Sequence, residues 1–247
     1  MSNHPQDFLP AQAHDAIEAL GDDVWWVPGT MRMNKLMGVS RNMVIVRSGD
    51  ELTLLNPIRL DAAGEQQLEQ LGRVRHLVRL GCFHGCDDAY LKQRYGAEFW
   101  CQADSRTYPE PPSDHVLAED WPLPFPDAQL LVFREVKRPE CALLIRRGDG
   151  ILVTCDSLQH YTNWQRHSLI ARLAMPLMGF SRRLLVGPLW LKFQTPADSS
   201  VRPDFERLLK LDFDALISAH GAPLMQDAKN QARGAVERAF ADKGANR

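Results

Sequence analysis

Hydrophobic residues in the first half of the chain gather in short runs that are typical of β-strands. Five such runs predict strands, at residues 24–29, 43–47, 51–55, 74–78 and 98–101. The turn Ser48-Gly49-Asp50 joins the second run to the third and predicts a β-hairpin. Residues 62–71 carry apolar or small side chains at helical spacing, and residues 87–95 begin with a carboxylate. Both segments end at a glycine, so we expect helices there.

The second half of the chain again places strands before helices. Its apolar runs predict strands at residues 129–134, 141–146, 151–154 and 215–218. The sequence Arg147-Gly148-Asp149-Gly150 has the chemistry of a hairpin turn and joins the second of these strands to the third. Residues 204–211 and 227–242 are the expected helices. Between the two halves, the proline-rich residues 108–126 show no clear periodicity.

Residues 160–195 combine apolar and basic side chains. Pro176, Gly179, Gly187 and Pro188 interrupt this segment, so it lacks the roughly 20 consecutive apolar residues that span a bilayer. The simplest interpretation is a pair of amphipathic helices that pack on the core. Alternatively, the segment is a helical insertion that serves as a lid, a dimer face or a membrane-surface contact.

Composition is typical of an ordinary globular protein. The chain has 247 residues, of which 45% are hydrophobic and 24% charged, and it is long enough to bury a substantial core. We therefore expect a single domain over residues 1–247, with an ordered core over about 22–242. With 29 Lys and Arg against 31 Asp and Glu, and a net charge of -2, no excess of positive charge indicates nucleic-acid binding.

The start of the chain and its cysteines both predict a cytoplasmic protein. Residues 1–11 are polar and contain proline, with neither a basic start nor an apolar stretch, so no signal peptide is expected. Five cysteines, an odd number, are then expected to stay reduced, as core residues or metal ligands rather than as disulfides. No phosphate-binding glycine loop and no G-x-S-x-G motif is present, so nucleotide-driven and serine-hydrolase functions lack support.

The densest group of chemically versatile side chains follows the strand predicted just before Leu80. Within seven residues lie Cys82, His84, Cys86, Asp87 and Asp88. Thiolate, imidazole and carboxylate are the groups with which proteins bind zinc and related metals. The cluster therefore predicts a metal site at the end of a strand, a common position for sites in layered α/β folds.

Two later segments offer further ligands, and each also follows a predicted strand. Asp156 comes after Thr154-Cys155, and His220 stands between Ala219 and Gly221. Structural explanations stay open for the candidates: Asp156 could cap the segment that follows it, the two cysteines of the cluster could be buried as small apolar side chains, and its two aspartates could lie at the N-terminus of a helix.

Together, the cluster, the strand that ends at Cys155-Asp156 and the sequence Ser218-Ala219-His220-Gly221 resemble the metallo-β-lactamase superfamily. The resemblance covers residues 24–240. It implies an α+β fold, a four-layer αββα sandwich of two mixed β-sheets flanked by helices, with one or two metal ions at the sheet edge. Members of the superfamily hydrolyse esters, thioesters, lactams or phosphodiesters, and some carry out redox chemistry.

The superfamily signature H-x-H-x-D-H is present only in part. Aligned without gaps, its four ligand positions fall on Cys82, His84, Cys86 and Asp87. Only His84 matches by residue type. The later aspartate of the superfamily falls on Asp156 and its last histidine on His220, whereas no histidine occurs near residues 135–139, where the third is expected.

These departures predict an altered site. The predicted metal ligands are His84, Asp156, His220, Cys82 and Cys86, and the predicted catalytic residues are Asp87 and Asp88. The first hypothesis is a metal-dependent hydrolase in which zinc or another divalent transition metal activates water for attack on an ester, lactone or phosphoester. The alternative is a non-catalytic protein that keeps the fold for binding or as a scaffold, without a metal. A small-molecule substrate and a homodimer are further expectations.

Overall fold

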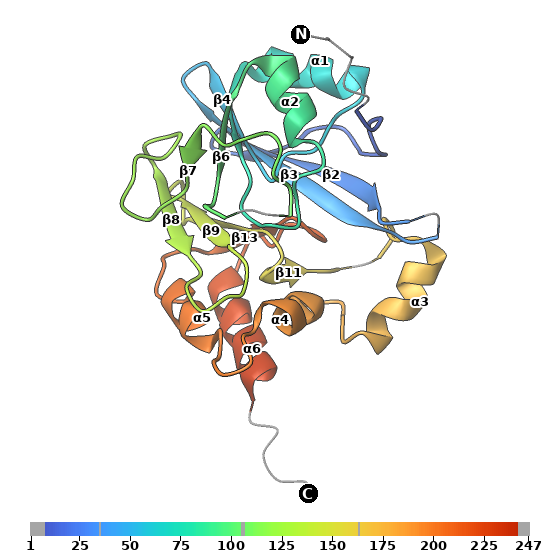
Figure 1. Ribbon diagram of the computed structural model, residues 1–247, viewed down its shortest axis with the longest axis vertical. Helices are drawn as coiled ribbons and strands as arrows, with labels where there is room; N and C mark the ends of the chain where they lie inside the picture. The colour runs from blue at the N-terminus through green and yellow to red at the C-terminus, as the bar shows by residue number, and fades with distance from the viewer. Residues whose placement is uncertain (1–7, 35, 105–106, 163, 242–247) are drawn as a thin grey trace, which may run out of the picture.

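The computed structural model describes residues 8–34, 36–104, 107–162 and 164–241. Two β-sheets lie face to face, and helices cover the outer face of each sheet (Figure 1). Each sheet contains both parallel and antiparallel neighbours. The predicted α+β fold, a four-layer αββα sandwich of two mixed sheets, is therefore confirmed.

The first sheet is built by the N-terminal half of the chain. Over the described ranges it consists of seven strands in sequence order: β1 (Glu18–Gly21), β2 (Val24–Arg32), β3 (Gly38–Ser48), β4 (Glu51–Leu55), β5 (Arg73–Val78), β6 (Glu98–Cys101) and β7 (His115–Val116). Neighbours are antiparallel from β1 to β4 and parallel from β4 to β7. The crossovers are α1 (Ala62–Leu71), which starts at the N-cap Asp61, and α2 (Asp88–Tyr95). Both helices cover the outer face of this sheet.

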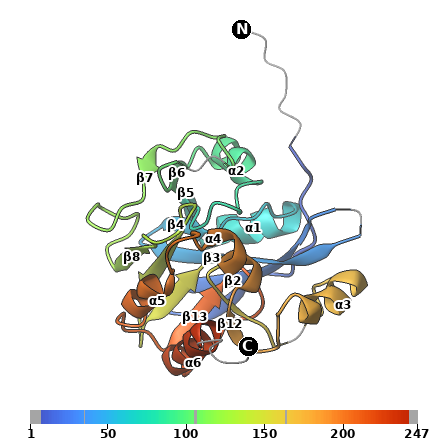
Figure 2. The ribbon, with the colours of Figure 1, turned by 60° about the horizontal axis from the view of Figure 1, so that its bottom comes forward.

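The second sheet has the strand order β13-β10-β9-β8. Its strands are β8 (Ala128–Val132), β9 (Cys141–Ile145), β10 (Ile151–Thr154) and β13 (Ala215–Ser218). Three helices cover its outer face (Figure 2): α4 (Pro188–Gln194), α5 (Arg202–Leu208) and α6 (Ala228–Phe240). The strands β11 (Leu158–His160) and β12 (Leu184–Val186) form a small antiparallel pair. The helix α3 (Leu169–Leu177) lies between them in the sequence.

Alternation along the strands explains the four layers. In β3, Val44 and Val46 face the core between the two sheets, whereas Met43 and Ile45 face the core under α1 and α2. All five residues of β9 are buried, because its two faces pack on different cores. Such strands, buried on both faces, appear in the sequence as continuous apolar runs rather than as alternating ones.

Two buried asparagines join the sheets at one edge. Asn42 of β3 donates from Nδ2 to the carbonyl oxygens of Ser218 (3.0 Å) and Gly221 (2.9 Å). Asn56, which follows β4, donates from Nδ2 to the carbonyl oxygen of Thr154 at 3.1 Å. These bonds fix the ends of β10 and β13 against the first sheet, at the edge where the predicted metal ligands lie.

Most predicted elements are confirmed, and the differences concern length and burial. β2 pairs with β3 over its whole length, so the first predicted strand extends beyond residue 29 to Arg32. A short strand, β7, lies in the proline-rich stretch. Residues 160–195 contain α4, whose Trp190 is buried as the simplest interpretation predicted, and α3, whose outer face is exposed and apolar. Of the predicted ordered core, residue 242 lies outside the described residues, and the single domain stays a prediction.

Within the described ranges, no helix has both the length and the apolar character needed to cross a bilayer.

Candidate metal centre

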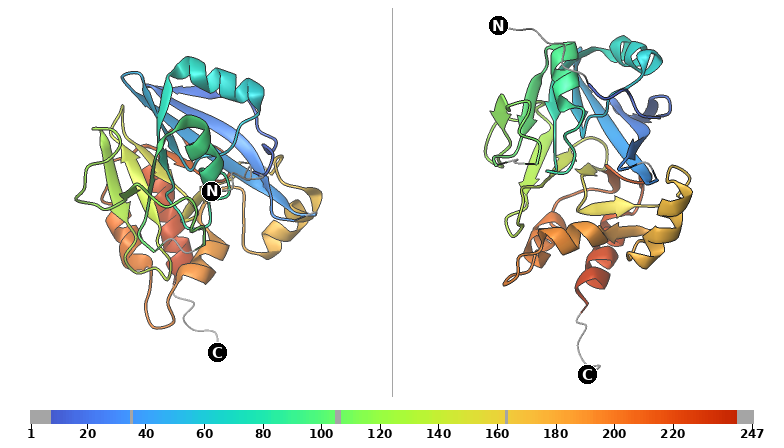
Figure 3. Two further views of the ribbon diagram at one scale, coloured as in Figure 1. Left: turned by 45° about the horizontal axis from the view of Figure 1, so that its top comes forward. Right: turned by 45° about the vertical axis from the view of Figure 1, so that its right-hand side comes forward.

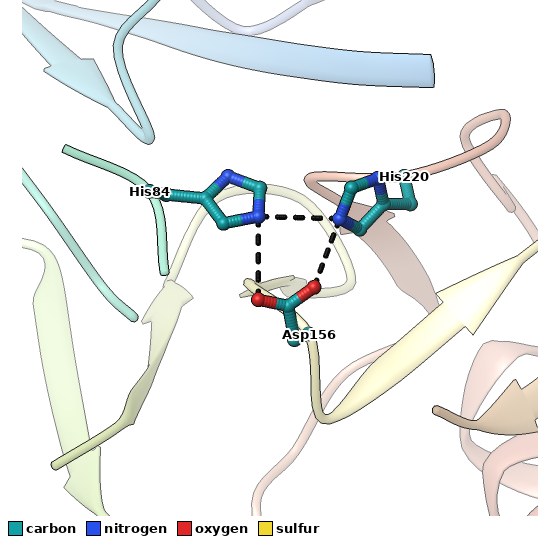
Figure 4. A group of neighbouring side chains, drawn as sticks. All are labelled: His84, Asp156 and His220. Carbon is teal, nitrogen blue, oxygen red and sulfur yellow. Dashed lines mark hydrogen bonds and ion pairs between the residues drawn. The ribbon is translucent and has the colours of Figure 1, made fainter. Parts of the chain in front are cut away.

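Three of the predicted ligands meet at one edge of the two sheets (Figure 4). Asp156 follows β10 and His220 follows β13, and because these strands are parallel neighbours, both residues emerge at the same edge. His84 comes from the other sheet, in the loop between β5 and α2. An isolated bridge between Gly81 and Glu140 holds this loop against the second sheet.

The three side chains direct their ligand atoms to a common point. The Nε2 atoms of His84 and His220 are 3.2 Å apart. Each also faces one carboxylate oxygen of Asp156, at 3.2 Å for His84 and 2.8 Å for His220. All three residues are buried. Each residue offers one ligand atom, and these three atoms all lie within 4.8 Å of one another. Among the described residues, these three are the candidate group for holding a metal ion.

These separations fit a metal ion. Zinc forms bonds of about 2.0–2.1 Å to histidine nitrogen and carboxylate oxygen, so the ligand atoms around a tetrahedral zinc lie about 3.3 Å apart. The two separations of 3.2 Å come close to this value, and the contact of 2.8 Å is somewhat shorter. Two imidazoles and one carboxylate are also the donor set of many catalytic zinc sites.

The protonation of His220 points the same way. Its Nδ1 lies 2.6 Å from the backbone carbonyl oxygen of Ser40, which can only accept, so Nδ1 carries the proton. Nε2, which faces the carboxylate of Asp156 at 2.8 Å, is then the ring nitrogen available to a metal ion. Burial lowers the pKa of His84, which favours the neutral imidazole that binds metals.

Asp156 is held as the ionised partner of the two histidines. Burial alone raises the pKa of a carboxyl group, but His84 and His220 reverse this effect and hold the pKa of Asp156 far below its usual range. This environment favours the carboxylate form of Asp156, which is the form that binds metals.

Glu140 supports Asp156 from the interior. Its carboxyl group is fully buried and accepts the backbone N–H groups of Asp156 (3.0 Å) and Ser157 (2.8 Å). Burial and the nearby charge of Asp156 raise the pKa of Glu140 well above its usual value, which favours the neutral form. A glycine is needed beside it, because a Cβ atom on Gly81 would lie 2.5 Å from Sγ of Cys155 and 3.0 Å from Oε2 of Glu140.

The two predicted cysteine ligands lie outside the group of three. Cys82 is buried, and its Sγ accepts from Nε2 of Gln194 at 3.8 Å. Burial raises the pKa of the Cys82 thiol to about 12, which disfavours the thiolate that binds metals. Sγ of Cys86 lies 2.6 Å from Nη1 of Arg41. Metal binding by either cysteine stays a prediction.

Asp87 and Asp88 form ion pairs with buried arginines. Nη1 of Arg41 lies 3.0 Å from Oδ2 of Asp87, and Nη1 of Arg79 lies 2.8 Å from Oδ2 of Asp88. Burial raises the pKa of Asp88 to about 7. These pairs anchor the loop that carries His84, and the catalytic role of the two aspartates stays a prediction. Sequence reasoning missed both arginines and Glu140, because no pattern distinguishes a buried charge from an exposed one.

Residues close in sequence to the three ligands line two cavities. The larger, of about 850 Å³, has Cys82, Lys137 and Arg138 in its wall. Lys137 therefore lines a cavity in the region where the third histidine of the superfamily signature was expected. The smaller, of about 380 Å³, is lined by Gly221, the neighbour of His220, and by His167. His167 is buried, and in the described structure neither of its ring nitrogens has a hydrogen-bond partner.

Comparisons with known proteins reveal similarity of structure without similarity of sequence. No protein-family model matches the chain, and no curated protein sequence matches it. The crystal structure of DIM-1 metallo-β-lactamase exposed to ceftazidime is similar with a TM-score of 0.62 at 10% identity, covering 94% of this chain and 100% of that chain. The metallo-β-lactamase FIM-1 from Pseudomonas aeruginosa in the mono-zinc form gives 0.57 at 16% identity, with 95% and 98% coverage.

A third structure, a metallo-β-lactamase from Hirschia baltica, gives a TM-score of 0.59 at 15% identity and covers 90% of this chain and 98% of that chain. In each case nearly the whole of both chains is matched, so the similarity extends to the full sandwich and not to one motif. The chain therefore has the metallo-β-lactamase fold, as the residues at its strand ends predicted.

Proposed function

We propose that the protein is a metal-dependent hydrolase in which His84, Asp156 and His220 hold one divalent transition metal. The observation that carries this proposal is the convergence of two Nε2 atoms and one carboxylate on a single point. Zinc suits this donor set best. FIM-1, which shares the fold, is described in a mono-zinc form, and this supports a site for a single metal here.

The ion would supply a Lewis acid that activates water and polarises the bond to be cleaved. The chain supplies the surroundings of that ion. The carbonyl oxygen of Ser40 fixes the tautomer and orientation of His220, and Glu140 fixes the backbone of Asp156. Three protein ligands leave a coordination position free for water, which is the pattern of catalytic rather than structural zinc sites.

The larger cavity supports a substrate with an anionic group. Two basic residues, Lys137 and Arg138, and one acidic residue, Asp104, line it, together with Cys82, two residues before His84. Paired basic side chains attract carboxylates and phosphates. Within the ester, lactone and phosphoester classes, the excess of one positive charge favours a small phosphoester or an ester that carries a carboxylate.

The test combines metal content with turnover. Chelator-treated protein is resupplied with zinc or manganese, its bound metal is measured by mass spectrometry, and chromogenic carboxylate and phosphate esters are offered as substrates. We expect about one equivalent of metal and metal-dependent hydrolysis, both lost in Asp156→Asn. The matched control His115→Ala removes an imidazole from β7, at the far edge of the first sheet, and keeps both properties.

Two outcomes would contradict the proposal. Protein that takes up no metal after resupply favours the non-catalytic alternative, a binding or scaffold protein. Turnover that survives in Asp156→Asn, or that is lost equally in the His115→Ala control, separates the activity from this site.

A further inference from the structure

Helix α3 turns a broad apolar face away from the protein. Its inner face is anchored by Ala171 and Met175, which are buried, and Met175 packs with Tyr161 and Leu185. At about 100° per residue, four large apolar side chains lie on the opposite side of the helix. They are Leu169, Ile170, Leu173 and Leu177, exposed by 75%, 44%, 76% and 90%. A helix that serves only to cover a core carries polar residues on this side.

The tip of the β2–β3 hairpin extends this apolar face. Met33 and Leu36 at the tip are 59% and 67% exposed. Ser168, the N-cap of α3, holds the tip in place: its N–H donates to the carbonyl oxygen of Gly38 at 3.0 Å, and its hydroxyl donates to that of Leu36 at 2.9 Å. Figures 1 and 3 show α3 and the tip side by side, apart from α4, α5 and α6. We call these six exposed apolar side chains the α3–hairpin surface.

The two segments that carry this surface contain basic but no acidic residues, although Arg166 forms an ion pair with Asp15 from the N-terminal region. Residues 157–197 contain five Arg or Lys and no Asp or Glu, and residues 24–49 also lack Asp and Glu. Four arginines of these two segments are exposed: Arg32, Arg172, Arg182 and Arg183. Because the whole chain has a net charge of -2, these two segments are more basic than the rest of the chain.

We propose that the α3–hairpin surface docks the protein on an anionic lipid membrane. An exposed helix with large apolar side chains on one side and arginines beside it lies in the plane of a bilayer, with the apolar chains below the headgroups and the arginines at the lipid phosphates. A second copy of the chain fits less well, because a symmetric contact would place two positive surfaces against each other.

Docking in this way has a consequence for the smaller cavity. His167, in its wall, immediately precedes the N-cap of α3. The membrane would therefore lie close to this cavity. The docking itself depends on neither metal binding nor hydrolysis, so its test is separate from that of the proposed function.

Co-sedimentation with vesicles tests the proposal. The full-length protein is mixed with vesicles of phosphatidylcholine alone or with added phosphatidylglycerol. We expect binding to the anionic vesicles that weakens as salt is raised. Leu173→Asp/Leu177→Asp is expected to lower the partition coefficient about tenfold or more, and Arg182→Glu/Arg183→Glu about tenfold. The matched control Trp121→Asp changes a residue that is 68% exposed in the connection between β7 and β8, and it binds like wild type.

Three results would overturn the proposal. The first is wild-type protein that stays in the supernatant with anionic vesicles. The second is equally strong binding to neutral vesicles. The third is a stable dimer in light scattering that the Leu173→Asp/Leu177→Asp variant dissociates, because the surface would then be an interface between copies. Thermal unfolding of each variant checks that the fold is retained, and the arginine variant tests the same surface without changing its apolar residues.

Discussion

Replacing Glu140 by leucine removes the acceptor of two buried backbone N–H groups, those of Asp156 and Ser157, and keeps most of the side-chain volume. Each buried donor left without a partner costs about 1–3 kcal/mol, so Glu140→Leu should lower the free energy of unfolding by about 2–6 kcal/mol. Glu140→Gln keeps an oxygen at the accepting position. Because the raised pKa favours the neutral form of Glu140, this change should cost less than about 1 kcal/mol.

Urea-induced unfolding of the three proteins in chelator measures these differences without a contribution from bound metal. The pH dependence supplies a second check. A carboxyl group whose pKa is raised by folding stabilises the protein fully only below the unfolded value of about 4.3 and loses that contribution as pH rises. Glu140→Gln should therefore gain stability relative to wild type from acid to neutral pH. A Glu140→Gln variant as unstable as Glu140→Leu would show that the accepting oxygen does not stabilise the two N–H groups.

Burial lowers the pKa of His167 to about 4 in the folded protein, compared with about 6.5 in the unfolded chain. The contribution of the neutral His167 to the free energy of unfolding is therefore present above pH 6.5 and is lost as the pH falls toward 4. His167→Leu should thus remove about 2.5 kcal/mol from the difference in unfolding free energy between pH 7.5 and 4.5, and an unchanged difference would contradict this. Gly221 has a φ of 86°, and a Cβ atom there would lie 1.8 Å from the carbonyl oxygen of His160, so Gly221→Ala should lower both the melting temperature and the zinc affinity. The control Gly49→Ala changes a glycine with a φ of 65° and open space around it. It should cost only about 1 kcal/mol and leave the zinc affinity unchanged. Arg79→Met removes the cation that pairs with the buried Asp88. Because the pKa of Asp88 is already raised to about 7, its carboxyl group then takes up a proton, and the loss should be about 1–3 kcal/mol. Adding Asp88→Leu should recover part of this loss, and strict additivity in urea unfolding would exclude the ion pair.

The position of the candidate site was predictable because it depends on local patterns. Apolar runs ending at residues 78, 154 and 218 are confirmed as the ends of β5, β10 and β13. The ends of parallel neighbours meet at one edge, so polar residues directly after them are candidates for a common site. His84, Asp156 and His220 follow these strands, and the resemblance to the metallo-β-lactamase signature selected them from among the other candidates. For the two cysteines the sequence left both metal binding and burial open, since the choice depends on the direction in which each side chain leaves the loop.

Features that depend on long-range packing escaped the sequence. The extension of β2 was missed because Pro28 and Gly29 have low strand propensity. Gly29 is nevertheless required there, since a Cβ atom would lie 2.8 Å from the carbonyl oxygen of Arg41 and 2.7 Å from Cδ1 of Ile58. The apolar spacing of α3 predicted a helix correctly, but spacing alone does not indicate whether a face packs on the core or remains exposed, as Leu177 does.

Whether His84, Asp156 and His220 bind one metal ion can be seen by anomalous diffraction at the zinc absorption edge, from crystals of zinc-supplied protein. We expect a single strong peak at about 2.0–2.2 Å from Nε2 of both histidines and from the carboxylate of Asp156. The absence of a peak between these three side chains, or a zinc ion bound elsewhere in the chain while they contact only one another, would contradict this expectation.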